Sequence, residues 1–258
     1  MKIVTLISDW KLKDPYVSMF KGAMLSSIPD VTIVDISHAI PLFDIKQTAF
    51  ILRSVYSTFP NDSLHIILTA STFSSTEKPI CVQYNNHHFL GYDNGIFSIL
   101  FDTLDELQAF EYSLAEEEAS SYLNKLVNMA KWLFNNQLSN FTSPFSNFKM
   151  ALQQKVIFDE NAKKISGQIA YIDSCYNAVT NIPVDKFEEF GQNRAFLATI
   201  ASSNYLKITK CCDFYNASEE EIYFVKNRLG FIEITMYQSN IAILGNIKIG
   251  DKVEIVFN

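Results

Sequence analysis

Two aspartates near the N-terminus stand where chemistry is expected in an α/β protein. Asp9 and Asp14 follow an apolar run over residues 3–7, and Pro15 comes next. The run predicts a short buried strand, and Pro15 predicts the first turn of a helix. Ligands of open α/β sheets bind where strands end and helices begin, so Asp9 is placed to accept hydrogen bonds from both hydroxyls of a ribose diol. The alternative for this motif alone is that Asp9 or Asp14 only caps the helix.

Several blocks of the chain share one ordered pattern with a known family. They read SDWKLKDPYV (residues 8–17), IVDISHAIPLFDI (33–45), GYDNGIFS (91–98), YIDSCYNAVTNIP (171–183), GFIEI (230–234) and QSN (238–240). In this order they resemble the S-adenosylmethionine (SAM) hydroxide adenosyltransferases, relatives of the SAM-dependent fluorinases and chlorinases. The resemblance implies substitution at the ribose C5′ of SAM, nominally hydrolysis to adenosine and L-methionine, with SAM as substrate and no separate cofactor.

The resemblance also implies a set of substrate-binding residues. Asp9 matches the family's ribose-diol carboxylate, and Phe43 matches an aromatic residue packed against the ribose or the sulfonium. The remaining matches are Asp173 for the methionine ammonium, Asn177 and the backbone of Gln238 for the adenine edge, Phe214 for stacking on adenine, and Arg228 for the methionine carboxylate. For each residue taken singly, burial or capping is the competing interpretation.

The chain departs from the family at the groups that prepare water. Hydroxide-transferring members carry an Asp, an Arg and a His, whereas the matching positions here are Ala70, Glu77 and Ser121. A general base contributes about 10²–10⁴-fold to a rate, so hydrolysis should be slow unless another group, such as a buried Glu77, replaces it. Two other functions therefore stay open. One is a non-catalytic binding protein for SAM or adenosine, and the other is transfer to an anion such as halide through the hydroxyls of residues 71–76.

Hydrophobic periodicity indicates which elements position these residues. In the first part of the chain it predicts strands over residues 3–7, 31–36, 64–69, 80–84 and 88–91, and helices over 16–28, 45–59 and 120–134. The near-continuous apolar run at 31–36 predicts burial on both faces. His87 and His88 stand between two strand-like runs and are interpreted as a polar hairpin connection. The fold class is α/β, with a mostly parallel α/β domain over residues 1–140.

The remainder of the chain has a different pattern. Polar residues and prolines cluster over 135–149, which predicts a domain boundary. Beyond it, short strands are expected at 156–158, 168–172, 196–200, 206–209, 222–226, 231–236 and 252–257, with a helical turn at 184–190. This spacing predicts a smaller antiparallel β-barrel or sandwich over residues 150–258. The resemblance implies the same layout in a homotrimer whose sites are shared between neighbouring subunits.

Composition limits the classes of partner. The formal net charge is −7 and no basic stripe is present, which argues against nucleic acid. No stretch approaches about 18 apolar residues and the chain starts directly in a strand, so we expect a cytoplasmic protein with no membrane partner. Four cysteines without a Cys-x-x-Cys pair and four scattered histidines predict neither a disulfide framework nor a metal site.

Overall fold

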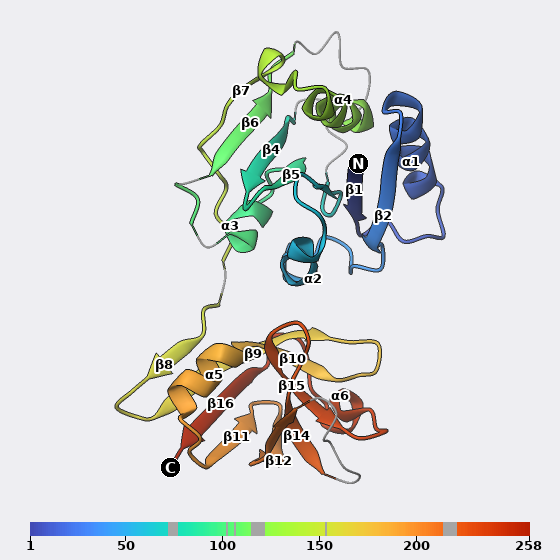
Figure 1. Cartoon of the computed structure of the whole chain (residues 1–258). Helices are drawn as coiled ribbons and strands as arrows, with labels where there is room; N and C mark the ends of the chain where they lie inside the picture. Colours follow the sequence, from blue (N-terminus) through green and yellow to red (C-terminus); the bar gives the residue numbers. More distant parts are fainter. Residues whose placement is uncertain (72–76, 102, 106, 115–121, 153, 214–220) are drawn as a thin grey trace. The chain divides into compact units, whose positions relative to one another are not determined.

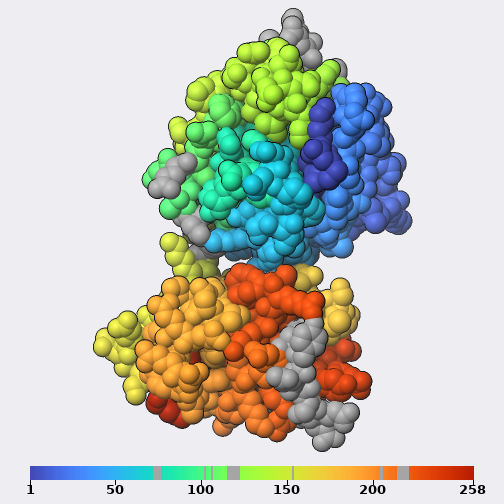
Figure 2. Space-filling model, viewed as in Figure 1, coloured from blue at the N-terminus to red at the C-terminus, as the bar shows by residue number. Residues whose placement is uncertain are grey.

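The computed structural model describes the chain except residues 72–76, 102, 106, 115–121, 153 and 214–220. The chain divides into two compact units, Met1–Leu152 and Gln153–Asn258, each with its own sheet (Figure 1). In the space-filling view, the start of the chain lies at the surface beside residues of α1 and β2 (Figure 2).

The first unit is built on a seven-stranded mixed sheet with the order β2-β1-β3-β5-β4-β6-β7. Its strands are β1 (Lys2–Ile7), β2 (Val31–Ser37), β3 (Leu64–Ile67), β4 (Pro79–Tyr84), β5 (His87–Tyr92), β6 (Gln108–Tyr112) and β7 (Thr142–Pro144). The pairings within β2-β1-β3-β5 are parallel, whereas β4, β6 and β7 add antiparallel pairings, so the sheet is less parallel than predicted. The α/β class is therefore confirmed, in a sheet that is parallel over one half.

Helices cover both faces of this sheet (Figure 1). They are α1 (Tyr16–Ser27), α2 (Ile45–Val55), α3 (Ile96–Leu100) and α4 (Tyr122–Phe134), with single 3-10 turns at Tyr56–Thr58 and Leu138–Asn140. Leu6 of β1 shares a core with α1 and α4, whereas the adjacent Ile7 shares a second core with α2 and α3. Neighbouring strand residues point to opposite faces, so β1 is buried on both sides.

Two local predictions in this unit are wrong. β2 is not buried on both faces, because it is the edge strand of the sheet and its Thr32 and Val34 side chains are exposed. His87 and His88 do not form the hairpin connection but belong to β5, where His87 is buried. The connection is Asn85-Asn86, whose φ angles of 47° and 60° suit a two-residue turn that matches the twist of the paired strands.

The second unit is built on a nine-stranded sheet. Its elements are β8 (Ile157–Asp159), β9 (Lys164–Ile172), β10 (Ala178–Pro183), α5 (Val184–Gly191), β11 (Phe196–Ile200), β12 (Ser203–Ile208), β13 (Cys211–Asp213), β14 (Ile222–Lys226), β15 (Phe231–Met236), α6 (Ile241–Leu244) and β16 (Lys252–Phe257). The order β12-β11-β16-β9-β10-β15-β14-β13 is antiparallel except for β13 beside β14, and β8 pairs with β9.

The long strand β9 curls this sheet into a half-barrel. Its first half pairs with β16 and its second half with β10, so β9 passes from one half of the sheet to the other. Gly167 lies at this crossing, and a Cβ there would come within 2.6 Å of Ile182 Cγ1. The concave side holds a single apolar core that includes Ile169, Phe224 and Ile255. A curled β unit thus follows the α/β unit along the chain.

Two further features are the absence of a membrane-spanning helix among the described residues and the state of the cysteines. No helix among the described residues combines the length and the apolar character that crossing a bilayer requires. All four cysteines are free, with Cys81 buried and Cys175 exposed. Burial raises the pKa of the Cys81 thiol to about 12, so this side chain behaves as a small apolar core residue.

Candidate functional site

The first candidate site lies at the carboxyl ends of β1, β2 and β3. β1 lies between β2 and β3, so the chain leaves β1 towards one neighbour and later returns to the other side. The crossover helices α1 and α2 consequently pack on opposite faces. Such a reversal of strand order opens a crevice at the carboxyl end of the strands, where α/β proteins bind ligands. Asp9 follows β1 and occupies this position.

The carboxylate of Asp9 joins the three loops. Its Oδ2 atom accepts the backbone N–H of Phe43, at 2.8 Å, from the loop after β2. The same atom accepts the backbone N–H of Ala70, at 3.1 Å, from the loop after β3. Asp9 is 4% exposed, and Oδ1 receives no hydrogen bond from the described residues. One oxygen therefore holds the loops, and the other remains as an acceptor.

The two donors to Asp9 have a strained backbone. Phe43 and Ala70 adopt φ angles of 63° and 50°, in the left-handed region that residues with a Cβ rarely enter. Each such residue costs on the order of 1–3 kcal/mol, and such strain is concentrated at binding and catalytic sites. The Ala70 turn is held from the other side by Asn94, whose Nδ2 donates to the carbonyl of Thr69 at 3.1 Å. Both N–H groups are thereby fixed on the carboxylate.

The Phe43 side chain lies open to solvent at this site. It is 66% exposed, beside the exposed Leu42 and just before α2, whose N-cap is Asp44. The Asp44 carboxylate accepts the N–H of Gln47 at 2.9 Å, which fixes where the helix begins. The backbone of Phe43 is thus held by Asp9 and by the helix start, while its aromatic face is free for a ligand.

Three positions were expected, from the resemblance, to carry water-activating groups in related proteins. Ala70 contributes only its backbone N–H to the Asp9 cluster. Glu77 is half-buried, and its backbone carbonyl accepts Nζ of the buried Lys125 at 3.1 Å. Ser121 lies outside the described residues, as do residues 72–76 of the hydroxyl-rich loop. Within the described part of the chain, no three potential ligands gather into a group that could hold a metal ion.

The second candidate site is the turn that joins β9 to β10. Asp173 Oδ1 accepts the backbone N–H groups of Cys175 and Asn177, at 2.9 and 2.8 Å. Its Oδ2 accepts Nδ2 of Asn177 at 3.0 Å, and Asn177 Oδ1 in turn accepts the hydroxyl of Thr235 at 2.7 Å. A carboxylate offers about four lone-pair directions, so Asp173 can still accept one further hydrogen bond.

Other predicted residues of this unit divide between the two ends of β15. Gln238 follows the C-terminal end of β15, the end at which Thr235 meets Asn177. It is exposed, with φ of 49°, so its backbone groups are turned away from the regular strand pattern. Arg228 lies in the β14–β15 turn, at the opposite end of the strand. Phe214 lies outside the described residues.

Glu233 is a residue of interest that the sequence reasoning did not single out. It is 5% exposed on β15, where its Oε2 accepts Nδ2 of Asn227 at 3.0 Å. Burial raises the pKa of the Glu233 carboxyl and outweighs the opposing effect of the Asn227 hydrogen bond, and the negative charge of Asp173 raises it further. A charged residue within the apolar alternation of 231–236 is the signal that marks it.

Comparison with known proteins places this geometry in a family. The SAM hydroxide adenosyltransferase N-terminal domain matches residues 4–132, and the corresponding C-terminal domain matches residues 167–254. The (R)-S-adenosyl-L-methionine hydrolase of Methanocaldococcus jannaschii is 28% identical over 269 residues, covering 100% of this chain and 97% of that protein. The fluorinase of Nocardia brasiliensis is 31% identical over 81 residues, covering 31% of this chain and 27% of the fluorinase.

A solved structure supports the fold. An uncharacterized conserved protein from Thermotoga maritima superposes with a TM-score of 0.84 at 20% identity, covering 98% of this chain and 99% of that one. At this identity the likeness concerns the fold alone. Both halves of the chain thus follow an architecture that a solved protein also adopts.

Proposed function

Because this chain belongs to the SAM hydroxide adenosyltransferase family, we propose that it binds SAM and transfers its adenosyl group to water. The reaction forms a C5′–O bond and breaks the C5′–S bond, whose electron pair leaves with the methionine sulfur. The products are adenosine, L-methionine and a proton. The observation that carries the proposal is Asp9, whose Oδ2 is fixed by two backbone N–H groups while Oδ1 accepts no hydrogen bond from the described residues.

Different side chains recognise different parts of SAM in this proposal. Asp9 accepts the ribose hydroxyls, and Phe43 offers an exposed aromatic face for the sulfonium, an attraction of up to about 2 kcal/mol once desolvated. Asp173 has one acceptor direction left for the methionine ammonium. Asn177 and Gln238, at one end of β15, read the adenine edge, and Phe214 stacks on the ring. Arg228 is the proposed partner of the methionine carboxylate.

The rate of hydrolysis should be low. An anionic nucleophile and a cationic sulfonium neutralise each other in the transition state, so a site that removes water from both lowers the barrier. Alignment of the two reactants lowers it further. At the position where the resemblance implies a carboxylate base, however, Ala70 presents a methyl group. We therefore propose tight binding with slow turnover.

Two alternatives rest on specific observations. A non-catalytic SAM- or adenosine-binding protein is favoured by Ala70, which retains the N–H that holds Asp9 but offers no base. Transfer to an anion such as halide is favoured by Ser71, whose buried Oγ has no hydrogen-bond partner among the described residues.

One experiment separates these functions. The purified protein is incubated with SAM, with and without chloride or fluoride, and products are followed by chromatography. Adenosine with methionine supports hydrolysis, and a 5′-halogenated nucleoside supports anion transfer. Binding detected by calorimetry without any product supports the binding protein. Absence of binding at millimolar SAM contradicts all three.

A further inference from the structure

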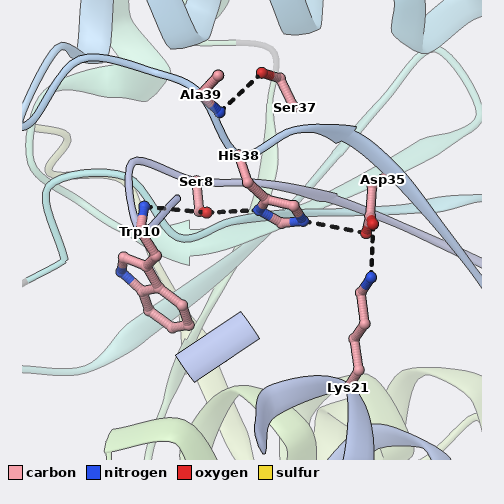
Figure 3. A network of polar contacts seen from close by, with 7 residues as sticks. All are labelled: Ser8, Trp10, Lys21, Asp35, Ser37, His38 and Ala39. Carbon is pink, nitrogen blue, oxygen red and sulfur yellow. Dashed lines mark hydrogen bonds and ion pairs between the residues drawn. The ribbon is translucent and has the colours of Figure 1, made fainter. Parts of the chain in front are cut away.

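A buried polar network stands directly beside Asp9. Ser8 Oγ lies 2.6 Å from His38 Nδ1, and His38 Nε2 lies 3.1 Å from Asp35 Oδ1 (Figure 3). Lys21 of α1 closes the network, with Nζ 2.6 Å from Asp35 Oδ2. Ser8 is fully buried and His38 is 5% exposed. The substrate-binding set proposed above uses none of these side chains.

The direction of each hydrogen bond follows from the partners. Asp35 is an ionised acceptor, because the hydrogen bonds from Lys21 and His38 and the charge of Lys21 outweigh its partial burial and hold the pKa of the carboxyl below its usual value. His38 Nε2 lies 3.1 Å from this acceptor, and the tautomer with its proton on Nε2 presents Nδ1 to Ser8 as an acceptor. The Ser8 hydroxyl donates to Nδ1 and accepts the backbone N–H of Trp10, at 3.3 Å.

The same segments are joined along their backbones. The Ser8 N–H donates to the carbonyl of Ser37, and the Lys11 N–H donates to the carbonyl of His38, each at 2.9 Å. Asp9 lies between these two links. Its Oδ2 accepts from Phe43, which belongs to the same loop after β2. The Ser8–His38 bond is the side-chain contact that fixes the backbone immediately before Asp9 against this loop.

We propose that His38 is a positioning residue that acts through Ser8 to aim the free oxygen of Asp9 at the ribose diol. This inference rests on the proposed function, since it assigns a specificity role within the same site. Loss of the Ser8–His38 bond frees the backbone on one side of Asp9, so the carboxylate no longer meets both hydroxyls at hydrogen-bond distance. Selection of ribose over deoxyribose, rather than adenine binding as a whole, should then suffer.

Two substitutions of His38 distinguish the role of Nδ1, which contacts Ser8, from that of Nε2, which contacts Asp35. His38→Asn keeps an acceptor near the position of Nδ1 and loses the contact with Asp35. His38→Gln keeps a donor near the position of Nε2 and loses the contact with Ser8. Ser8→Ala removes the same bond from its other end. Calorimetry with adenosine and with 2′-deoxyadenosine gives the selectivity ratio for each full-length variant.

The chain contains a matched control. Thr5, also on β1 and four residues before Asp9, makes a buried hydroxyl–histidine bond of 2.8 Å with His65 Nδ1. Thr5→Val removes a bond of the same kind without touching the site. Its thermal stability should fall, as for Ser8→Ala, while the selectivity ratio stays unchanged.

We expect His38→Gln and Ser8→Ala to lower the ribose selectivity about tenfold, which corresponds to about 1.4 kcal/mol. His38→Asn should retain it within about threefold. An unchanged ratio in His38→Gln and Ser8→Ala, with stability lowered as in Thr5→Val, would overturn the inference and leave the proposed function standing. Equal binding of both nucleosides by the unmodified protein would overturn both. If His38→Gln does not fold, Ser8→Ala against Thr5→Val decides the question.

Discussion

Replacing Asp9 by Asn tests whether Oδ2 holds the two loops while Oδ1 accepts hydrogen bonds from the ribose. The amide oxygen can take the place of Oδ2 and accept the N–H groups of Phe43 and Ala70, which lie 2.8 and 3.1 Å from that atom. The amide NH₂ then stands where Oδ1 was, so the ribose hydroxyls lose the charged acceptor for their protons. The structure should survive, while recognition of the sugar is lost.

The size of the effect follows from the two hydrogen bonds at stake. A hydrogen bond to a charged group contributes about 1.5–3 kcal/mol, and a neutral one about 0.5–1.5 kcal/mol. Over two hydroxyls the loss is about 2–3 kcal/mol, which is roughly a 30- to 150-fold weaker dissociation constant. The free energy of unfolding should change by less than about 1.5 kcal/mol, because the buried N–H groups keep an acceptor.

Calorimetry with adenosine measures the affinity, and chemical denaturation measures the stability. Binding of 2′,3′-dideoxyadenosine is the control, because it has no diol and should respond little to Asp9→Asn. Asp9→Ala is the second control, and it should unfold more easily because two part-buried N–H donors lose their acceptor. Adenosine affinity that is equal in the Asn variant and the unmodified protein would refute the reasoning.

Three further predictions concern catalysis, stability and assembly. The combined change Ala70→Asp, Glu77→Arg and Ser121→His should raise adenosine formation at least about 10²-fold with little change in SAM affinity, and an unchanged rate in single-turnover assays would contradict it. Burial and the charges of His87 and His88 lower the pKa of His65 from 6.5 to about 3. The unfolded state therefore binds protons first, and the free energy of unfolding should fall by up to about 1.4 kcal/mol per pH unit below pH 6.5. Denaturation at pH 7 and pH 5 should show a smaller difference for His65→Asn than for the unmodified chain, and equal differences would count against it. Sedimentation at micromolar concentration should show the expected homotrimer, and a monomer would argue against shared sites.

Much of the first unit could be predicted because each element has its own pattern. The apolar run before Asp9 and the helical spacing after Pro15 both describe local structure, and the structure has β1 and α1 there. The exposure of residues on β2 could not be predicted, because it depends on β2 being an edge strand, and the order of the strands is set by segments later in the chain. The same holds for His87, which is buried and packs against Tyr56 and His65 from other parts of the chain.

The site was predictable in its carboxylates and not in their partners. Asp9 stands out at the end of a strand, but its donors Phe43 and Ala70 lie 34 and 61 residues away. His38 meets Ser8 across 30 residues, and no local spacing indicates that contact. In the second unit, β10 was not predicted, because the polar Thr180 and Asn181 interrupt its apolar pattern. It nevertheless lies near the middle of its sheet. Long-range contacts of this kind become visible only in the fold.

We propose that the protein binds SAM but hydrolyses it slowly. The most direct test of this claim is one titration followed by one time course. Calorimetry should show SAM binding to the unmodified protein, and the same sample at saturating SAM should then release adenosine far more slowly than about 1 per second, a rate within the range typical of enzymes. Turnover at about 1 per second or faster would contradict the claim that Ala70, Glu77 and Ser121 leave the site without a competent base. Absence of SAM binding would contradict the assignment of the Asp9 crevice itself.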